Sequence, residues 1–452
     1  MSAKLTMAAL TMALLVIPGM STANTIHVPG DWTTIQDAIE HGAEGDTILV
    51  APDTYTGPSN RDLDFGGVNM LLVAEGDRVD TVIDCEGAGR GFHFSTGEDT
   101  TLVIQGFTVT NAVADTGAGA KCIMGSSPKF VDCAFSGNTA TDRGGGISCR
   151  SSSPVVVGCV FDGNVVSGGT YAYGGAISCI ANADARIAGC DFTGNEADGF
   201  GGAVYCNQQS DPRMTGCTFS ANTAGSGGGG LFSVSSAPVI TGCTFGGNSG
   251  QQGGAIYTQS SPVTVTGSRF VGNSAAYTGG AVSFLYATSN GTLTDCTFVG
   301  NTSQVGAAIK CAFGADALIT GCTFVGNDST TGDGTLVFSD ASPTVENAII
   351  AFASGGSAVR CTSGTETPSF SYCVVFDNAG GDDLCGSVGD TMNRDPRLCD
   401  IAGSDYTLCA NSPCIAGNNA WGEDVGAHGA GCGNCDSPVE VTTWSIIKGS
   451  YR

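Results

Sequence analysis

The stretch GGAIYTQSSPVTVTGSRFVGN, residues 253–273, decides the fold, because most of its features return every 25 to 31 residues. Its closing motif, Phe-x-x-Asn, occurs eight times, with gaps of 26, 31, 27, 26, 25, 28 and 26 residues between successive asparagines. These asparagines are Asn138, Asn164, Asn195, Asn222, Asn248, Asn273, Asn301 and Asn327. A glycine-rich motif followed by β-forming residues, such as GGAI at 174, lies in each interval. The chain is therefore built from internal repeats.

The spacing inside each repeat predicts short strands separated by bends. A cysteine, or Ser268 in one copy, stands two residues before each Phe, so the two side chains point to one face of a strand. An apolar residue, such as Ile240, stands three residues before that cysteine. Residues at an odd separation cannot face the same side of one straight strand, so the chain must turn between them. With a further strand after the glycine motif, we expect three strands per repeat.

Three strands and three bends in roughly 26 residues, stacked about 4.8 Å apart, predict an all-β fold, namely a parallel β-helix or solenoid. In this fold the repeated Phe side chains line the core. The repeated asparagines form a structural ladder in a bend, where the side-chain amides satisfy backbone groups of neighbouring coils. Eight equal copies suit this role better than a row of ligand-binding amides. The glycine pairs permit the positive φ or close approach that another bend requires.

Composition limits the function classes. The formal net charge of the 452 residues is −25, so nucleic acid and anionic membrane surfaces are poor partners. The chain has 70 glycines, and only 13% of its residues are charged while 41% are hydrophobic. This combination is unlike a disordered acidic chain and favours many short strands joined by tight turns.

The first 23 residues have the features of a secretory signal peptide. Lys4 precedes an apolar run over residues 5–17, and Ser21-Thr22-Ala23 offers small residues at the cleavage site. The mature chain is expected to begin near Asn24. No later stretch approaches the 18 or more apolar residues of a membrane-spanning helix. We therefore expect a protein that is secreted or held at a bacterial cell surface. Association with the outer membrane is one form that this can take.

The alternation of GGA[IV] with FxxN over about residues 120–330 resembles the polymorphic outer membrane protein repeat. Such repeats are found in bacterial surface and autotransporter passenger proteins and in many proteins of the pectin-lyase-like superfamily. The resemblance implies a single-stranded, right-handed parallel β-helix. The β-helix is expected to cover residues 61–360, with the core repeats at about 120–330.

Both ends of the β-helix differ from the repeats. Residues 25–57 resemble the opening segment of such proteins, and Ile35, Ala38 and Ile39 share one helical face, so residues 24–60 are expected to form an N-terminal cap with a short helix. Residues 361–438 are expected to form Cys-rich C-terminal coils and an end cap. The tail, VEVTTWSIIKGSYR at 439–452, is either a sorting or attachment signal or a frayed terminus.

The chain has 21 cysteines, of which 12 fall in two repeat positions that point inward. Stacked free thiols are favoured there over disulfides between coils, because parallel neighbours seldom offer the required geometry. Another eight lie between Cys361 and Cys435, where an exported chain favours disulfides of undetermined connectivity. The pair Cys432 and Cys435 has the CxxC spacing of zinc or redox sites, which is a weak signal alone.

The resemblance also implies possible polysaccharide lyase or glycoside hydrolase activity, which needs a calcium-binding carboxylate cluster with a basic residue, or clustered aspartates with a histidine. The best carboxylate pair is Asp162 and Asp191, placed outward on adjacent coils and offset by two residues. Strand geometry separates them by about 8 Å, within the range of inverting glycosidases. The alternative is that both are simply solvated. Calcium binding between acidic loops stays open, and no other cofactor is indicated.

A binding surface is predicted on the strand that follows the glycine motif. Its outward positions are expected to be Ser148, Ser178, Tyr205, Ser233, Tyr257, Ser283 and Lys310. Tyr205 and Tyr257 would then stand two coils apart, about 10 Å, with Tyr171, Tyr173 and Tyr277 in the loops leading into the same strand. Exposed aromatic rings could stack on sugars or anchor a protein partner. The alternative is that tyrosine merely favours strands.

The sequence thus favours a secreted or cell-surface, adhesin-like scaffold that binds an extracellular glycan or surface protein without catalysis. One alternative is a polysaccharide lyase or glycoside hydrolase, and another is a structural envelope protein. The fold alone does not choose between them. Neither the ligand nor the oligomeric state is indicated by the sequence.

Overall fold

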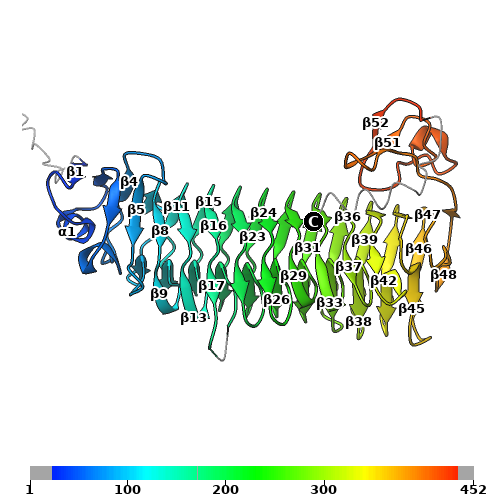
Figure 1. Cartoon of the computed structure of the whole chain (residues 1–452), viewed down its shortest axis with the longest axis horizontal. Helices are drawn as coiled ribbons and strands as arrows, with labels where there is room; N and C mark the ends of the chain where they lie inside the picture. Colours follow the sequence, from blue (N-terminus) through cyan, green and yellow to red (C-terminus); the bar gives the residue numbers. More distant parts are fainter. Residues whose placement is uncertain (1–22, 170–171, 436–452) are drawn as a thin grey trace, which may run out of the picture.

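The computed structural model describes residues 23–169 and 172–435, and most of them form one long parallel β-helix (Figure 1). Four sheets run along its axis, and each repeat passes through sheet A, sheet B, sheet D and sheet C in that order. Neighbouring coils pair in parallel throughout these four sheets. The all-β parallel β-helix expected from the repeats is confirmed.

Sheets A and B are the longest. Sheet A consists, in stacking order, of β1 (Thr25–Val28), β2 (Thr47–Val50), β4 (Leu71–Ala74), β7 (Val103–Gln105), β11 (Lys129–Val131), β15 (Val155–Val157), β19 (Arg186–Ala188), β23 (Arg213–Thr215), β27 (Val239–Thr241), β31 (Thr264–Thr266), β35 (Thr292–Thr294), β39 (Leu318–Thr320), β43 (Thr344–Glu346), β46 (Ser369–Ser371) and β48 (Ser387–Val388). Sheet B consists of β3 (Asp53–Tyr55), β5 (Thr81–Asp84), β8 (Thr108–Thr110), β12 (Ala134–Ser136), β16 (Val160–Asp162), β20 (Asp191–Thr193), β24 (Thr218–Ser220), β28 (Thr244–Gly246), β32 (Arg269–Val271), β36 (Thr297–Val299), β40 (Thr323–Val325), β44 (Ile349–Ala351), β47 (Cys373–Phe376) and β49 (Thr391–Met392).

Sheets C and D form the other two sides of the coils. Sheet C consists of β6 (Phe92–Phe94), β10 (Ala120–Ile123), β14 (Ile147–Arg150), β18 (Ile177–Ile180), β22 (Val204–Asn207), β26 (Leu231–Val234), β30 (Ile256–Gln259), β34 (Val282–Leu285), β38 (Ile309–Ala312), β42 (Gly334–Ser339) and β45 (Ser357–Cys361). Sheet D consists of β9 (Val113–Thr116), β13 (Thr139–Arg143), β17 (Val165–Val166), β21 (Glu196–Ala197), β25 (Thr223–Ala224), β29 (Ser249–Gln252), β33 (Ser274–Thr278), β37 (Thr302–Ser303) and β41 (Asp328–Ser329).

The repeats contain four strands, so the expectation of three was wrong. The additional strand belongs to sheet D and follows each ladder asparagine directly. Several of its strands have only two residues, such as β21 and β25, and bury a small side chain, Ala197 or Ala224. A two-residue strand with one buried alanine produces no apolar pattern that differs from a bend.

The core is filled by the side chains that the repeat positions predict. Eight Phe rings, from Phe135 to Phe324, stack along the axis with successive centroids 4.5 to 5.2 Å apart. The apolar residues of sheet A, such as Met214 and Ile240, are fully buried on the facing side. Each coil thus buries its apolar side only against its neighbours, which makes the stack the unit of stability.

The eight repeated asparagines form a continuous ladder of hydrogen bonds. All are buried, with exposed fractions of 0 to 1%. In each pair of adjacent coils, Nδ2 of one asparagine donates to Oδ1 of the next over 2.9 to 3.1 Å, as in Asn195 to Asn222. The same Oδ1 accepts from the backbone amide of the preceding asparagine. The asparagine side chains therefore bond to each other and to the backbone in the interior of the coils.

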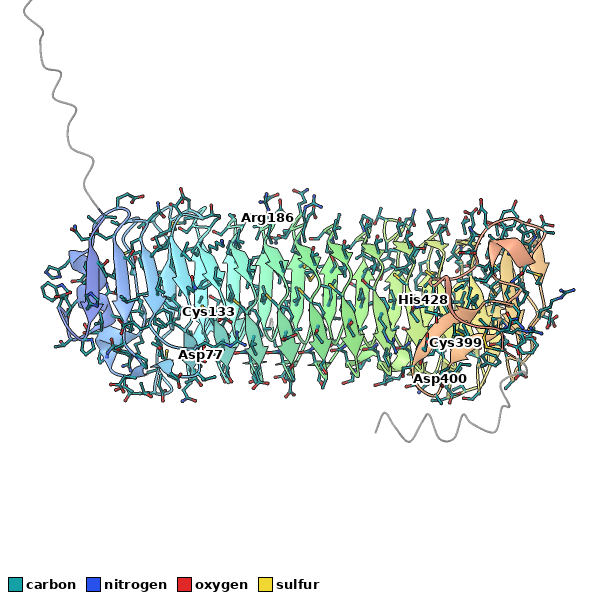
Figure 2. All side chains as sticks on the ribbon, turned by 90° about the horizontal axis from the view of Figure 1, so that it is seen from above. Asp77, Cys133, Arg186, Cys399, Asp400 and His428 are labelled. Carbon is teal, nitrogen blue, oxygen red and sulfur yellow. A yellow bond between two sulfur atoms is a disulfide. The ribbon has the colours of Figure 1, made fainter. Side chains whose placement is uncertain are left out.

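The cysteines of the repeats are free thiols, all of them buried. One row precedes the Phe ladder and includes Cys133, which lies inside the β-helix (Figure 2). Its thiols contact backbone carbonyls, as Cys217 Sγ does to Thr215 O at 3.5 Å. Ser268 takes the same place and donates to Thr266 O at 3.1 Å, so the position requires a small side chain rather than a sulfur.

A short helix closes the N-terminal end of the β-helix. This helix, α1 (Ile35–His41), begins where Thr34 Oγ1 accepts a hydrogen bond from the Asp37 amide at 3.2 Å. It buries Ile35, Ala38 and Ile39, as their shared helical face predicts. A single 3-10 turn, η1 (Pro58–Asn60), follows, and the Asn60 side chain accepts from the Ile35 amide at 2.9 Å.

The C-terminal subdomain (residues 394–435) does not cap the far end of the stack, which corrects the expectation of an end cap. It contains β50 (Leu398–Asp400), β51 (Asp405–Cys409), η2 (Ala416–Asn418) and β52 (Ala430–Cys432). It lies against the flank of the β-helix, on the outer face of sheet B (Figure 1). Its apolar contacts there are Val299, Val325 and Ile349.

Hydrogen bonds fix the C-terminal subdomain to this flank. His428, labelled in Figure 2, has its Nε2 2.7 Å from Thr297 Oγ1. The Ala427 amide donates to Thr323 Oγ1 at 2.9 Å. The sequence carries a signal for this docking site, because three repeats read FVGN and present Val271, Val299 and Val325 outward. Other repeats present Ser, Asp, Thr or Gly there.

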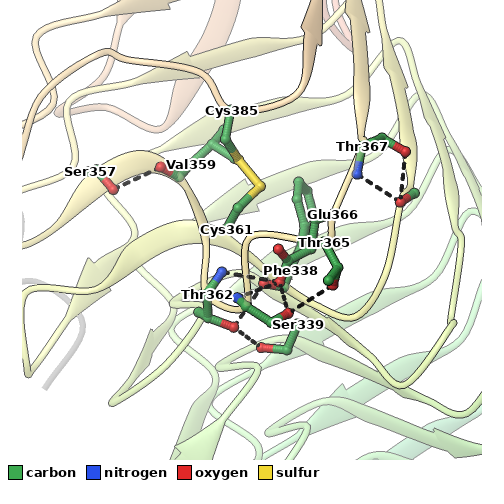
Figure 3. Close-up of a disulfide and its surroundings, with 12 residues drawn as sticks. Phe338, Ser339, Ser357, Val359, Cys361, Thr362, Thr365, Glu366, Thr367 and Cys385 are labelled. Carbon is green, nitrogen blue, oxygen red and sulfur yellow. Dashed lines mark hydrogen bonds between the residues drawn. A yellow bond between two sulfur atoms is a disulfide. The ribbon is translucent and has the colours of Figure 1, made fainter.

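Three disulfides lie in the C-terminal region, which confirms disulfide bonding there and gives the pairing. They join Cys361 to Cys385, Cys399 to Cys432 and Cys409 to Cys435, while Cys373 and Cys414 are buried free thiols. The first ties β45 to the segment before β48 (Figure 3). Beside it, Glu366 Oε1 accepts hydrogen bonds from the Ser363 amide at 2.8 Å and from the Asp340 amide at 3.2 Å.

Three sequence-based expectations concern residues that the structure does not describe. The signal peptide over 1–23, the candidate Tyr171 and the tail over 439–452 lie outside the described residues, wholly or nearly so, and stay predictions. In residues 23–169 and 172–435, no helix combines the length and apolar character needed to cross a bilayer.

Candidate functional site

A groove of about 320 Å³ lies on the outer face of sheet C near its N-terminal end. One wall comes from the ends of β9 and β13, and the floor comes from β10, β14 and β18. The lining residues are Asp115, Thr116, Lys121, Ile123, Asp142, Arg143, Ser148, Arg150 and Ile180. Charged side chains of both signs therefore meet in one concave place.

Strand register explains why these side chains meet. Lys121 pairs with Ser148 across β10 and β14, so both point outward on adjacent coils. Arg143 pairs with Thr116 across β13 and β9, and β13 has one extra residue, a bulge, between Ala140 and Arg143. Asp142 and Asp115, which precede this pair, therefore lie on neighbouring coils beside the bulge. Adjacent parallel strands lie about 4.8 Å apart. The groove thus holds two aspartates on neighbouring coils at its wall.

The glycine pair beneath this wall lets the chain turn from sheet D into sheet C. In the copy that follows Asp142, Gly144 has φ 62°, and a Cβ on Gly145 would stand 2.5 Å from the Gly175 carbonyl oxygen. A side chain at either place would be strained or would clash with backbone. Because the turn is tight, the residue before each pair lies against the outer face of sheet C.

Ion pairs organise the charges in the groove. Asp115 pairs with Arg90 and lies 3.8 Å from Lys121 Nζ, while Asp142 lies 3.1 Å from Arg143. Arg150 is exposed and forms no ion pair within the part of the chain that the structure describes. In a chain with 42 acidic and 17 basic residues, this groove gathers an unusual share of positive charge.

The pKa of Asp115 is lowered from its ordinary value. Partial burial raises it, but a hydrogen bond from the Thr116 amide at 2.8 Å and the charges of Arg90 and Lys121 outweigh that effect. Asp115 is therefore a carboxylate at neutral pH. An ionised carboxylate can serve as a base or nucleophile, whereas a neighbouring carboxyl group would have to supply a proton.

The predicted tyrosine strip is not an exposed surface, which corrects the binding interpretation. Tyr205 and Tyr257 are exposed by only 3% and 1%. They pack with Phe232, Ile180 and, from the loops, Phe200 and Tyr173 into a small outer core on sheet C. Tyr173 stacks on Tyr205 with centroids 4.7 Å apart, and Phe200 on Phe232 at 4.4 Å.

The hydroxyl groups of this outer core are also occupied. Asn207 Nδ2 donates to Tyr205 Oη at 2.7 Å, and Gln259 Nε2 donates to Tyr257 Oη at 2.5 Å. Burial raises the pKa of Tyr205 to about 12 and also raises that of Tyr257. Tyr277 alone of the described tyrosine candidates is more exposed than buried, at 52%.

One outward position was assigned wrongly. The residue in register between Tyr205 and Tyr257 is Phe232, and Ser233 pairs instead with the inward Cys206 and Thr258. The reason is the run of four glycines at 227–230, which allows two alignments of the repeat that differ by one residue. A shift of one residue exchanges the two faces of a strand. Phe232 therefore completes the outer aromatic core.

Asp162 and Asp191 are both exposed on the outer face of sheet B rather than in the groove. Asp191 is in register with Val160 and Thr193 with Asp162, so the predicted offset of two residues between adjacent coils is present. The sheet on which they stand is two sides of the coil away from the floor of the groove. Their arrangement alone does not identify a site.

Sequence reasoning missed Asp115 and Asp142, although a signal exists. Each lies seven residues before the cysteine of the following sheet C strand, in DTGAGAKC and DRGGGISC. Two carboxylates at one repeat position on consecutive coils must be neighbours in a solenoid.

The histidines and cysteines do not contribute to the groove. His428 is at the interface with the C-terminal subdomain, and His41 stacks on Trp32 with centroids 3.7 Å apart. In the described ranges, one group of three candidate metal ligands converges within 4.8 Å, Cys399, Cys409 and Cys432, and all three are in disulfides. Cys432 and Cys435 pair with different partners and not with each other.

Comparison with known families gives one match. The family described as "Right handed beta helix region" matches residues 91–270 and 267–392. None of the curated proteins matches this sequence.

Several solved structures share the fold at low identity. The pectate lyase Pel9A is 14% identical, with a TM-score of 0.31, over 91% of this chain and 98% of that one. A mannuronic acid specific family 6 polysaccharide lyase from human gut microbiota is 11% identical, with a TM-score of 0.36, over 77% and 86%. The catalytic unit of a thermostable GH87 alpha-1,3-glucanase from Streptomyces thermodiastaticus is 13% identical, with a TM-score of 0.32, over 78% and 66%. These similarities are too low to carry any argument about substrate or reaction.

Proposed function

Because the chain belongs to the family of right-handed β-helix proteins, we propose that it is an exported, polysaccharide-active protein that binds an acidic glycan in the groove on sheet C and cleaves it there. The observation that carries this proposal is the meeting of two aspartates and three basic side chains in one groove. The interpretation as a non-catalytic adhesin rested in part on an exposed tyrosine strip, and the tyrosines at its centre are buried.

The basic side chains suit a glycan that carries carboxylates. Arg150 has a free guanidinium group at the exposed edge, and Lys121 and Arg143 line the same groove. A guanidinium binds a carboxylate through two parallel hydrogen bonds, which gives orientation as well as affinity. The chain carries a net charge of −25, so basic side chains gathered in one groove favour an acidic glycan there over the molecule as a whole.

The paired aspartates suit cleavage of a glycosidic bond. The two aspartates stand on neighbouring coils, whose strands are about 5 Å apart, and glycosidases likewise use two carboxyl groups within about 10 Å of each other. Asp115, which is held ionised, is assigned as base or nucleophile, and Asp142 as the second carboxyl group of the pair. Lys121 and Arg143 orient the two carboxyl groups through the ion pairs already described.

Glycan binding without cleavage is the second candidate, and one contact favours it. Asp115 forms ion pairs with both Arg90 and Lys121. A carboxylate shared by two cations can have the purely structural role of holding the groove in shape. Export through the segment at 1–23, attachment through 439–452 and residence at the cell surface belong to the proposal in either case.

The test uses the full chain with polygalacturonate, alginate and a neutral xylan, with and without calcium. Retention of protein in gels that contain each polymer measures binding, and release of new reducing ends measures cleavage. We expect Asp142→Asn to lower the cleavage rate by at least about a hundredfold while retention is kept. The matched control is Asp162→Asn, an exposed aspartate on sheet B, which should leave both unchanged.

Each outcome decides between the candidates. Retention without new chain ends supports binding alone and rejects the catalytic assignment of the aspartates. Neither retention nor cleavage with any polymer rejects the proposed function. New ultraviolet absorbance in the products would show elimination rather than hydrolysis.

A further inference from the structure

Two aromatic side chains on neighbouring coils stay exposed at a corner of the β-helix. Tyr286 directly follows β34 and Phe313 directly follows β38. Their exposed fractions are 47% and 57%, among the largest for apolar or aromatic residues in the described ranges. Both have left-handed backbones, with φ of 75° and 55°. Bulky residues seldom adopt this conformation, so the presence of two aromatic residues at this turn needs a cause other than the backbone.

The scaffold itself does not require aromatic residues at this corner. The equivalent residue after other strands of sheet C is also left-handed, with φ between 48° and 59°, but most of these residues are small or polar: Met124, Ser151, Ala181, Gln208, Ser235 and Ser260. Serine or alanine therefore satisfies the turn. Tyr286 and Phe313 add conformational cost without the burial that would offset it.

The two rings form a firm but open surface. Their centroids are 6.0 Å apart with planes 27° apart, whereas successive rings of the inner Phe ladder are 4.5 to 5.2 Å apart. The backbones beneath them belong to the coil stack, because the Tyr286 amide donates to Ala312 O at 3.1 Å and the Phe313 amide to Ser339 O at 2.9 Å. The backbone of both residues is thus held in place, while about half of each side chain stays accessible.

We propose that Tyr286 and Phe313 form a carbohydrate-binding platform that holds the same polysaccharide chain as the groove. A sugar ring offers an apolar face to an aromatic ring and hydroxyl groups to its surroundings. Two isolated rings suit such a ligand better than a protein interface, which needs a larger continuous apolar area.

Continuity along the corner connects the platform with the groove. Met124, at the equivalent position six coils earlier, lies with Ile123, Arg150 and Ser151 around a shallow depression that adjoins the groove. Six coils span about 29 Å. A glycan that runs parallel to the axis therefore reaches both places, and short oligosaccharides reach only one. This inference rests on the proposed function for the identity of the polysaccharide ligand. It does not require that the protein cleaves that polysaccharide.

The experiment compares Tyr286→Ser combined with Phe313→Ser against wild type in the full chain. Serine occupies this corner in other coils, so folding should be preserved, and the temperature of unfolding checks that it is. We expect retention by long polygalacturonate to weaken about tenfold, while binding of a trigalacturonate is unchanged. The control is Ser260→Ala, at the same corner one coil earlier.

Unchanged retention by every polymer that binds the wild type would overturn the platform. So would a change in sedimentation without a change in retention, because the rings would then be an interface between two copies of the chain. Retention of the wild type is measurable whether or not the polymer is cleaved. Failure of the catalytic assignment and failure of the platform are therefore separate results.

Discussion

A buried asparagine must satisfy two amide hydrogens and a carbonyl oxygen without water, and Asn222 does so through three coils. Its Nδ2 donates to Phe192 O at 3.0 Å and to Asn248 Oδ1 at 2.9 Å. Its Oδ1 accepts from the amide nitrogen and from Nδ2 of Asn195 at 3.0 and 2.9 Å. Each residue of the ladder therefore ties its own coil to the coils on both sides.

Replacing Asn222 by Ala should lower the free energy of unfolding by about 3 kcal/mol. The substitution removes the acceptor of the Asn195 backbone amide, one of the two acceptors of Asn195 Nδ2, and a donor to the Phe192 carbonyl, and each buried group left unsatisfied costs about 1 to 3 kcal/mol. Urea unfolding followed by circular dichroism measures the change. The control is Thr218→Ala, on an exposed position of sheet B in the same coil, and a loss no larger than in that control would contradict the role of the ladder.

At the level of residues, inward positions could be predicted and outward ones could not. Phe219 and Asn222 recur in every copy because the coils above and below impose the same environment on them. Whether an outward side chain is exposed depends instead on its unlike neighbours. Tyr205 is covered because Tyr173 and Phe232 happen to flank it, and neither neighbour follows from the repeat.

At the level of elements, sheet B changes its outer face along the axis. Its early strands carry exposed polar residues such as Asp162 and Thr193, whereas β36 and β40 end on the buried Val299 and Val325. The C-terminal subdomain covers the second kind and places His428 at the seam, with Arg269 and Asp405 as its charged neighbours. Burial and the positive charge of Arg269 lower the pKa of His428, while Asp405 opposes them.

This environment predicts that docking of the subdomain weakens in acid. A histidine with a depressed pKa in the docked state binds a proton more readily when released, where its pKa is about 6.5. Its contribution is therefore present above about pH 6.5 and is lost as the pH falls through the depressed value. Hydrogen exchange of the Gly426 and Ala427 amides, corrected for its intrinsic pH dependence, should accelerate between pH 7 and pH 5.

Two variants frame that measurement. In His428→Asn the dependence on pH should disappear. Val325→Asp buries an unpaired charge in the docking face and should give fast exchange at every pH. Its exchange rate is the reference for a subdomain that has detached from sheet B. Equal pH dependence in wild type and His428→Asn would contradict the assignment to His428.

Three of the four sheets of the β-helix could be predicted from the repeat. Sheet D and the groove could not, because each depends on details of single coils. Sheet D was missed because strands such as β21 carry a single buried alanine. The groove was missed because it depends on how tightly the chain turns from sheet D into sheet C, which brings Asp115 and Asp142 against the outer face. Repeat spacing gives the order of strands but not the depth of the corners between them.

The whole molecule is an elongated, acidic rod with two different ends. At the N-terminal end, α1 covers the last layer of the core with Ile35, Ala38 and Ile39. At the other end, the coils finish with β48 and β49, whose residues are half-exposed or exposed. Strand edges and uncovered cores invite association with another chain, so the cap is expected to keep the molecule from associating at one end.

Unseating the cap should therefore promote self-association. Ile35→Asp combined with Ile39→Asp places charges where the side chains are now exposed by 0% and 3%. The helix should detach and leave the apolar end of the core in contact with water. Sedimentation should then show an average mass that rises more steeply with protein concentration than in wild type. Glu40→Gln, on the exposed side of the same helix, is the control.

The position of the C-terminal subdomain on the flank has a consequence for how such a molecule can vary in length. Among the described residues, the apolar docking contacts come from β32 and the strands of sheet B that follow it, so whole coils can be gained or lost between the groove and β32 without altering these contacts. Each change moves the groove along the axis by one fixed step of about 4.8 Å. The number of coils between the groove and the docking site therefore sets the distance along the axis between the groove and the C-terminal subdomain.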